Sequence, residues 1–214
     1  MADPALPRSC RGRLVVVEGP DRAGKTTLAR ALAADHGYVY VKLPDRSTAT
    51  GQVLHRFIAE GHAFSADHEA NETAAQLVFA ANNHEKRAHL LGLLESGRDV
   101  VLDRFLDSAV VYHSAAVGED RAAWILALNQ GMPLPDLVLV LELPFEAAAK
   151  RADMGKERND SEKIQTAVAR GYRARLDRAD APWPAAFLDA TASAGEVLAE
   201  AVETIGRVLP RVLG

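Results

Sequence analysis

The strongest constraint on the fold is the segment at residues 19–26, which reads GPDRAGKT and fits the pattern G-x-x-x-x-G-K-[ST] at every fixed position. The apolar run Leu14–Glu18 precedes it and predicts a buried strand. A helical pattern follows it, with Leu28 and Leu32 spaced i, i+4. A strand, a glycine-containing turn and a helix in this order are typical of the P-loop NTPase fold, a parallel sheet covered by helices.

The residue types of this turn fit a phosphate ligand. Gly19 and Gly24 let the chain curl so that successive backbone N–H groups point inward, and the positive end of the following helix dipole faces the same place. Lys25 supplies a charge for the β- and γ-phosphates, and the hydroxyl of Thr26 is a ligand for Mg²⁺. A turn without a ligand would require neither residue. The predicted ATP-binding residues in this segment are Gly19, Arg22, Ala23, Gly24, Lys25, Thr26 and Thr27.

Short apolar runs continue to alternate with longer helical patterns along the chain. This alternation predicts a three-layer α/β fold, a parallel sheet of about five strands with helices on both faces. A helical stretch over Asp67–Ser96 is expected to break once. No linker divides the 214 residues, so we expect one domain over residues 13–214 after a flexible arm at residues 1–12. The expected strands are Leu14–Glu18, Tyr38–Val41, Asp99–Asp103, Asp136–Leu141 and Ala186–Leu188.

Composition argues against several classes of function. A formal net charge of −4 disfavours a nucleic-acid partner, because affinity for a phosphate backbone needs a basic surface. No apolar run approaches the roughly 18 residues of a membrane span. The single cysteine, Cys10, cannot form a disulfide within the chain and suits a reducing compartment. We therefore expect a cytoplasmic protein without a nucleic-acid or membrane partner.

The variable positions of the phosphate loop carry further information. Asp21 and Arg22 place opposite charges beside the bound phosphates, where an arginine can stabilise the charge of the moving phosphoryl group. The alternative is an Arg22 that faces solvent and pairs with Asp21. The segment GPDRAGKTT at residues 19–27 resembles the phosphate loop of thymidylate kinases of the eukaryotic and poxviral type. In that branch of the family the loop itself carries the catalytic arginine.

Two later segments resemble the acceptor side of that family, in the family's order. The segment LPDRST at residues 43–48 resembles F-P-x-R-S-T, whose arginine, here Arg46, grips the acceptor phosphate. Asp103 and Arg104 open a segment that resembles D-R-[YF]-x-x-S-x-x-[AG]-[YF]. Asp103 stands at the carboxyl end of a predicted parallel strand and can hold the hydrated Mg²⁺, and Arg104 can clamp a monophosphate with two hydrogen bonds. The other acceptor residues of this segment are Phe105, Ser108 and Tyr112.

The predicted base contacts match the family only in part. The segment LVFAANNHE at residues 77–85 resembles L-L-F-S-A-N-R-W-E, whose phenylalanine, here Phe79, stacks on thymine. Asn83 stands where the family has an arginine that reaches the base edge, and Leu43 replaces a phenylalanine. Asn159 replaces a tyrosine near the acceptor. These three departures leave open an acceptor with another base, such as dUMP or a modified deoxyuridylate.

A charged segment at residues 151–160 resembles the family's lid, R-G-x-F-G-x-E-R-Y-E. A lid that closes over the site would exclude water, which competes as phosphoryl acceptor. The resemblance implies that Arg151 packs on adenine and that Lys156 and Arg158 add charge over the phosphates. Ala190 and Thr191 match the loop that borders adenine.

The family resemblance therefore implies an enzyme that transfers phosphate from ATP to dTMP, in dTTP supply, with Mg²⁺ held through Thr26 and Asp103. It also implies a homodimer. A nucleotide-binding module without catalysis and a nucleoside kinase are alternatives, but neither needs two arginines placed for an acceptor phosphate. The predicted catalytic residues are Asp21, Arg22, Lys25, Asp103 and Arg104, and Asp21 is also expected to contact the acceptor.

Overall fold

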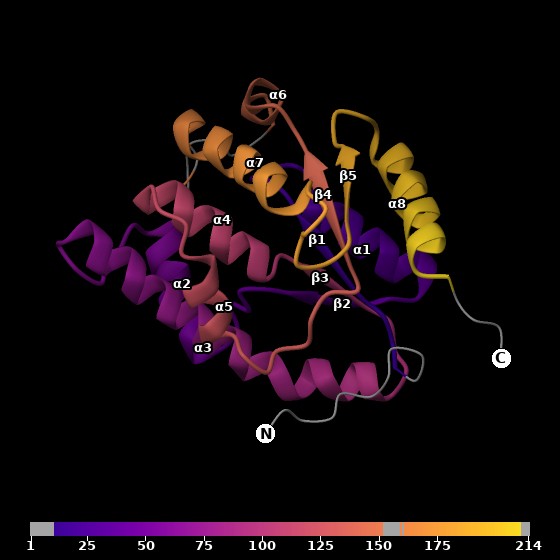
Figure 1. Cartoon of the computed structure of the whole chain (residues 1–214), viewed down its shortest axis with the longest axis horizontal. Helices are drawn as coiled ribbons and strands as arrows, with labels where there is room; N and C mark the ends of the chain where they lie inside the picture. Colours follow the sequence, from indigo (N-terminus) through magenta and orange to yellow (C-terminus); the bar gives the residue numbers. More distant parts are fainter. Residues whose placement is uncertain (1–10, 152–158, 160, 211–214) are drawn as a thin grey trace.

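A parallel sheet of five strands, in the order β2-β3-β1-β4-β5, forms the middle of the protein (Figure 1). The computed structural model describes residues 11–151, 159 and 161–210. The sheet confirms the predicted fold class, and each expected strand is found within a residue or two of its predicted limits. The strands are β1 (Leu14–Glu18), β2 (Val39–Lys42), β3 (Val100–Asp103), β4 (Leu137–Glu142) and β5 (Ala185–Asp189).

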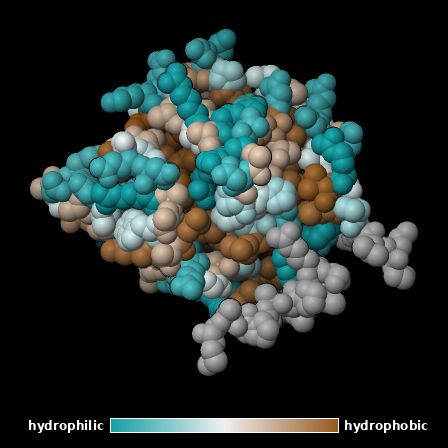
Figure 2. Space-filling view, viewed as in Figure 1, coloured by the Kyte–Doolittle hydropathy of each residue, from teal (hydrophilic) through white to brown (hydrophobic). Residues whose placement is uncertain are grey.

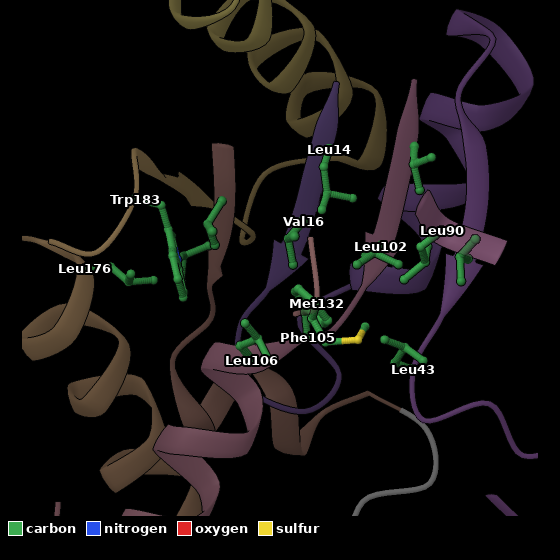
Figure 3. Close-up of a cluster of buried hydrophobic side chains, with 14 of the residues drawn as sticks. Leu14, Val16, Leu43, Leu90, Leu102, Phe105, Leu106, Met132, Leu176 and Trp183 are labelled. Atoms are coloured by element: carbon green, nitrogen blue, oxygen red, sulfur yellow. The ribbon is translucent and has the colours of Figure 1, made fainter. Parts of the chain in front are cut away.

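Helices cover both faces of the sheet because the strands are apolar on both sides (Figure 1). Leu14 and Val16 of β1 belong to a core shared with α3, α4 and α7 (Figure 3). Val15 and Val17 face the opposite way and pack with α1 and α8. In the described ranges the helices are α1 (Lys25–His36), α2 (Ala49–Ala59), α3 (His68–Glu95), α4 (Leu106–Val117), α5 (Ala122–Leu128), α6 (Phe145–Ala149), α7 (Glu162–Leu176) and α8 (Ala194–Val208).

The strand order puts β1 between β3 and β4, and this position defines the site. The chain leaves β1 through α1 toward β2 on one side of the sheet, and β4 lies on the other side. Ligands of open α/β sheets bind at such a switch point, beside the carboxyl ends of the strands. The turn at residues 19–24, the end of β3 and the end of β4 all lie at this edge.

One helical prediction was wrong, and one helix was missed. The stretch expected to break once is a single helix, α3, which is 28 residues long and begins at an Asp67 side chain that accepts a hydrogen bond from the Ala70 amide. Its interior has no proline, and its one glycine, Gly92, is placed near the end, where the helix continues through it. The short helix α5 was not predicted, because only Ile125 of its residues is buried and its period is too short to read.

The predicted arm and lid fall largely outside the described residues. Of the arm at residues 1–12, Arg11 and Gly12 are described, and both are held against the domain: the Arg11 guanidinium donates to the Asp136 carboxylate at 2.9 and 3.0 Å, and the Gly12 amide donates to the Leu94 carbonyl at 2.8 Å. The ordered domain therefore begins no later than Arg11. Of the lid, only Arg151 and Asn159 are described.

The surface in Figure 2 is mostly hydrophilic, with hydrophobic residues in small separate groups. Within the described part of the chain, no helix is both long and apolar enough to cross a membrane.

Candidate active site

The phosphate loop joins β1 to α1 through backbone conformations that only glycine adopts easily. Gly19 has φ 136°, and a Cβ there would lie 2.4 Å from the carbonyl oxygen of Leu141. Gly24 has φ 98° and caps the start of α1 without a side chain. Because the first N–H groups of a helix lack partners within the helix, the start of α1 presents donors and a positive dipole end to the cavity above it. Ala23, within the loop, is buried.

Lys25 lies inside this loop. Its ammonium donates to the carbonyl oxygens of Gly19 (2.9 Å) and Pro20. Burial is the main cause that lowers the pKa of Lys25, and the positive charge of Arg104 lowers it further. The carboxylate of Asp21 acts in the opposite sense and raises this pKa. A lysine with a lowered pKa gains from a negative ligand, because phosphate charge restores its protonated form.

Among the described residues other than glycine, two have a positive φ. Both are arginines, and both line the site. Arg22 has φ 62° in the phosphate loop, and Arg104 has φ 71° at the end of β3. Such conformations persist where the surroundings impose them, and they gather at functional sites. The Arg104 amide donates to the Val17 carbonyl at 3.0 Å, which ties this strained residue to β1.

The predicted metal ligands are neighbours. The Thr26 hydroxyl donates to Asp103 Oδ2 at 2.5 Å, and the Lys42 ammonium lies 3.4 Å from the same oxygen. Burial would raise the pKa of Asp103, but the hydrogen bond from Thr26 and the charges of Lys42 and Arg104 hold it below its usual value. A hydroxyl and an ionised carboxylate at the phosphate loop are hard oxygen ligands, and they fit Mg²⁺.

A cavity above the phosphate loop brings together six of the residues predicted to bind ATP. It is lined by Arg22, Gly24, Lys25, Thr26, Thr27, Lys42, Asp103, Arg104 and Arg151. Lys42, at the end of β2, was not predicted from the sequence. The side chain of Arg151 donates to the carbonyls of Arg22 (2.6 Å) and Ala190 (2.8 Å), so Ala190 lies beside this donor cavity.

Thr191 lies farther away. Its hydroxyl donates to Asp189 at 2.6 Å, and it lines a separate cavity beside Leu141 and Pro144. Lys156 and Arg158 lie outside the described residues.

Asp21 joins the phosphate loop to Arg104 by an ion pair and to α7 through Gln165. Gln165 donates to Asp21 Oδ2 and to the Asn159 carbonyl at 2.8 Å each, and its own oxygen accepts from the Asp21 amide at 2.8 Å. Burial would raise the pKa of Asp21, but the charges of Arg104 and Lys25 and the Gln165 hydrogen bond lower it to about 2. Asp21 is therefore ionised at neutral pH. Sequence reasoning missed Gln165, because no local pattern reveals a partner 144 residues away.

A second cavity adjoins the first, between α2, α3 and α4. All predicted acceptor residues line it: Asp21, Leu43, Arg46, Phe79, Asn83, Arg104, Phe105, Ser108, Tyr112 and Asn159. Glu72 and Gln76 of α3 and His113 of α4 line it as well and were not predicted. Lys42 and Arg104 line both cavities, so the acceptor cavity and the donor cavity meet at these two cations.

The loop that carries Arg46 is held by Asn82 of α3, which is fully buried. Asn82 accepts from the Asp45 amide at 2.8 Å and donates to the hydroxyls of Thr48 (2.8 Å) and Thr50 (3.0 Å). The close approach of this loop to α2 also requires Gly51, since a Cβ there would lie 1.8 Å from the Asp45 carbonyl oxygen. Asn82 lies in the segment at residues 77–85, where no local sequence pattern indicates that it holds a loop.

Glu18 supports Arg104, the other arginine predicted to bind the acceptor phosphate. Helix α4 has no capping side chain of its own, and the Glu18 carboxyl group accepts the amides of Phe105 (2.8 Å) and Ser108 (3.0 Å) at the start of this helix. It also accepts from the hydroxyls of Ser108 and Tyr172. Ser108 in turn accepts from Arg104 Nη1 at 3.3 Å. In the sequence, Glu18 stands out only as a charged residue at the end of an apolar strand, and this signal does not indicate which helix it contacts.

Asn83 is buried and its amide is oriented by α5. Its Nδ2 donates to Asn129 Oδ1 at 2.8 Å, and Asn129 Nδ2 donates to the Ile125 carbonyl at 2.8 Å. Phe79, one helical turn earlier on α3, lines the same cavity.

Chemically, the residues that line the two cavities are suited to two phosphorylated ligands. Cations and helix N–H groups surround the first cavity, and two arginines and several aromatic rings, Phe79 among them, line the second. The place where they meet is suited to direct transfer of a phosphoryl group, which requires positioning and charge neutralisation rather than a protein nucleophile.

Comparisons with known proteins identify the family that this chain resembles. The family model described as thymidylate kinase matches residues 17–201. The thymidylate kinase of Schizosaccharomyces pombe is 32% identical over 205 residues, which cover 92% of this chain and 93% of that protein. The human thymidylate kinase is 32% identical over 81% of each chain. A solved structure of thymidylate kinase from Candida albicans, described as having broad substrate specificity, superposes with a TM-score of 0.82 at 29% identity and covers 92% of both chains.

Proposed function

The chain belongs to the thymidylate kinase family, and on that premise we propose that it transfers the γ-phosphate of ATP to dTMP, giving ADP and dTDP for dTTP supply. The observation that carries this proposal is the meeting of two cavities at Lys42 and Arg104. A protein that only binds a nucleotide has no use for a second cavity with its own phosphate-binding arginines. A nucleoside kinase would not need Arg46 and Arg104 together beside an acceptor that lacks phosphate.

The proposed roles follow from charge and position. Lys25 and Arg22 neutralise the phosphoryl group as it moves, and the N–H groups at the start of α1 hold the donor phosphates. Arg46 and Arg104 grip the acceptor phosphate, and Phe79 stacks on the base. Asp21 keeps Arg104 in place through their ion pair. The attacking oxygen belongs to the acceptor phosphate, so no side chain has to act as a nucleophile.

We assign the metal site to Thr26 and Asp103, whose oxygens lie 2.5 Å apart. When bound there, Mg²⁺ neutralises the charge of the β- and γ-phosphates. Asp103 stays ionised because Thr26 and Lys42 lower its pKa, and it can therefore hold the metal or its water shell at neutral pH.

The proposed function is tested by turnover of the purified chain with ATP and Mg²⁺ and a panel of acceptors: dTMP, dUMP, dCMP, dAMP, dGMP and thymidine. ADP release is coupled to a spectrophotometric assay. We expect the highest kcat/KM with dTMP and no turnover with thymidine. A dTMP value below that of the other monophosphates would refute the assignment of the acceptor. Tight ATP binding without ADP release on any acceptor would refute the kinase.

The family resemblance also leads us to propose a homodimer that packs through helices. Val53 of α2 and Leu77 of α3 support it, because their side chains are 42% and 50% exposed although both are large and apolar. Light scattering during gel filtration tests the assembly state, and a monomeric mass at micromolar concentration would refute it.

A further inference from the structure

The side chain of Arg151 connects two loops that are far apart in the sequence. Arg151 comes two residues after the end of α6, a helix that lies at the carboxyl end of β4 (Figure 1). Its Nη1 donates to the carbonyl oxygen of Arg22 at 2.6 Å, and its Nη2 donates to the carbonyl oxygen of Ala190 at 2.8 Å. One guanidinium therefore spans the phosphate loop and the loop after β5.

The carbonyl that Arg151 holds belongs to a residue in a rare backbone conformation. Arg22 has φ 62°, a left-handed value that side chains other than glycine seldom adopt. At the preceding residue of the loop, the Asp21 amide donates to the side-chain oxygen of Gln165 at 2.8 Å. Arg151 and Gln165 thus hold the backbone of two consecutive loop residues, Arg22 and Asp21, and together they restrain the loop that carries the Arg22 side chain.

The chemistry of a guanidinium allows a second contact at the same time. Its N–H groups lie in the plane of the group and make the two carbonyl contacts, while its faces can stack on a planar base. Family resemblance places the adenine of ATP against Arg151. A base stacked on this exposed side chain restricts its motion, and the restriction passes to the Arg22 carbonyl through the hydrogen bond.

We propose that Arg151 is a positioning residue that couples recognition of the donor base to the placement of Arg22 over the phosphates. The proposal rests on the proposed function, because it gives Arg22 its role in phosphoryl transfer. It goes beyond packing against adenine: the Arg151 guanidinium acts on turnover through the phosphate loop, whether or not it also raises the affinity for ATP.

A double-mutant cycle tests the coupling. We measure kcat at saturating ATP and dTMP for the wild type, Arg151→Ala, Arg22→Ala and the double variant. Arg151→Ala is expected to lower kcat roughly 10- to 100-fold, since small misplacements of a catalytic group have effects of this size. In the Arg22→Ala background the same change should alter kcat less than about 3-fold, because the residue it positions is already absent.

Two matched variants separate the hydrogen-bonded fork from the charge. Arg151→Lys keeps the positive charge but cannot donate to both carbonyls as a planar group, so we expect it to lower kcat nearly as much as alanine. Lys150→Ala removes a neighbouring exposed cation and should leave kcat unchanged. Recovery of the wild-type kcat in Arg151→Lys would overturn the proposal in favour of a charge effect.

A donor without a base provides a readout that needs no turnover. Binding of magnesium tripolyphosphate is measured by calorimetry. We expect both Arg151 variants to bind it at least about 3-fold more weakly than the wild type does. A higher KM for ATP with unchanged kcat and unchanged tripolyphosphate affinity would overturn the proposal, because that result describes base stacking alone. Lack of dTMP turnover by the wild type would instead refute the proposed function, and tripolyphosphate binding would still decide the role of Arg151.

Discussion

Replacing Glu18 by alanine removes the group that closes the start of α4. The Glu18 carboxyl group is fully buried and accepts the amides of Phe105 and Ser108 and the hydroxyls of Ser108 and Tyr172. The two hydroxyls lie 3.0 Å apart and can still bond to each other. The two backbone N–H groups have no such substitute and become buried donors without a partner.

The expected loss of stability follows from these two donors. An unsatisfied buried N–H costs about 1–3 kcal/mol, so the pair costs about 2–6 kcal/mol. Removal of the carboxylate also relieves its repulsion of Asp107, whose pKa is raised to about 6 by burial and by Glu18. We therefore expect a loss of about 3 kcal/mol for Glu18→Ala. For a chain of this length, that loss corresponds to a fall in Tm of about 6–12 °C.

Urea unfolding and thermal melts measure this loss, and steady-state kinetics measures its effect on the acceptor site. Glu18→Gln keeps an oxygen that can accept both amides, so it should lose only about 1 kcal/mol. Glu200→Ala, on the exposed face of α8, should stay within about 0.5 kcal/mol of the wild type. Because the start of α4 supports Arg104, kcat/KM for dTMP should fall in the alanine variant and recover in the glutamine variant. Wild-type stability of Glu18→Ala, or equal losses for alanine and glutamine, would refute the reasoning.

Further predictions concern the charges of the site. Lys25→Ala and Arg22→Ala should each lower kcat by about 10²-fold or more with a native melting curve, and a near-normal rate for Arg22→Ala would exclude its role as a catalytic arginine. Asp21 has a pKa of about 2 in the folded chain, below the ordinary value near 4, so it contributes stability above pH 4 that is lost as the pH falls from about 4 to about 2. The free energy of unfolding at pH 7 exceeds that at low pH, and Asp21→Asn should reduce this difference by about 2 kcal/mol, as measured by urea unfolding at both pH values. Asp103→Asn should raise the Mg²⁺ concentration required for half-maximal turnover, and an unchanged magnesium titration would contradict the metal assignment.

Much of the fold could be predicted because its signals are local. The strands of the sheet are continuous apolar runs bounded by polar or glycine residues, and the turn at residues 19–26 requires a strand before it and a helix after it. The unbroken α3 and the short α5 were harder. Helix periodicity gives little guidance where a helix is amphipathic only in part, and α5 buries a single side chain, Ile125.

The site shows the same division between local and distant information. Its arginines and lysine stand in motifs whose spacing can be read directly. The residues that hold them cannot be read in this way, because their partners are far along the chain. Glu18 contacts Tyr172 across 154 residues, and Gln165 contacts Asp21 across 144 residues. Sequence patterns identify the groups proposed to act on substrates, and tertiary contacts identify the groups that hold them in place.

Asn83 shows how the structure narrows an ambiguity that the sequence leaves. An amide offers both donors and acceptors, so its substitution for the family's arginine could favour several bases. The hydrogen bond from Asn129 Nδ2 to the Ile125 carbonyl fixes Asn129 Oδ1 as an acceptor, because a carbonyl cannot donate. Asn83 Nδ2 must then face Asn129, which leaves the Asn83 carbonyl oxygen and one N–H for other partners. Thymine carries an N3–H donor between two carbonyl acceptors, and an amide presented in this way can pair with that edge. At this position the family's arginine offers charged hydrogen-bond donors, whereas Asn83 offers one neutral hydrogen-bond acceptor and one neutral donor. This change remains compatible with dTMP as the substrate that receives the phosphoryl group.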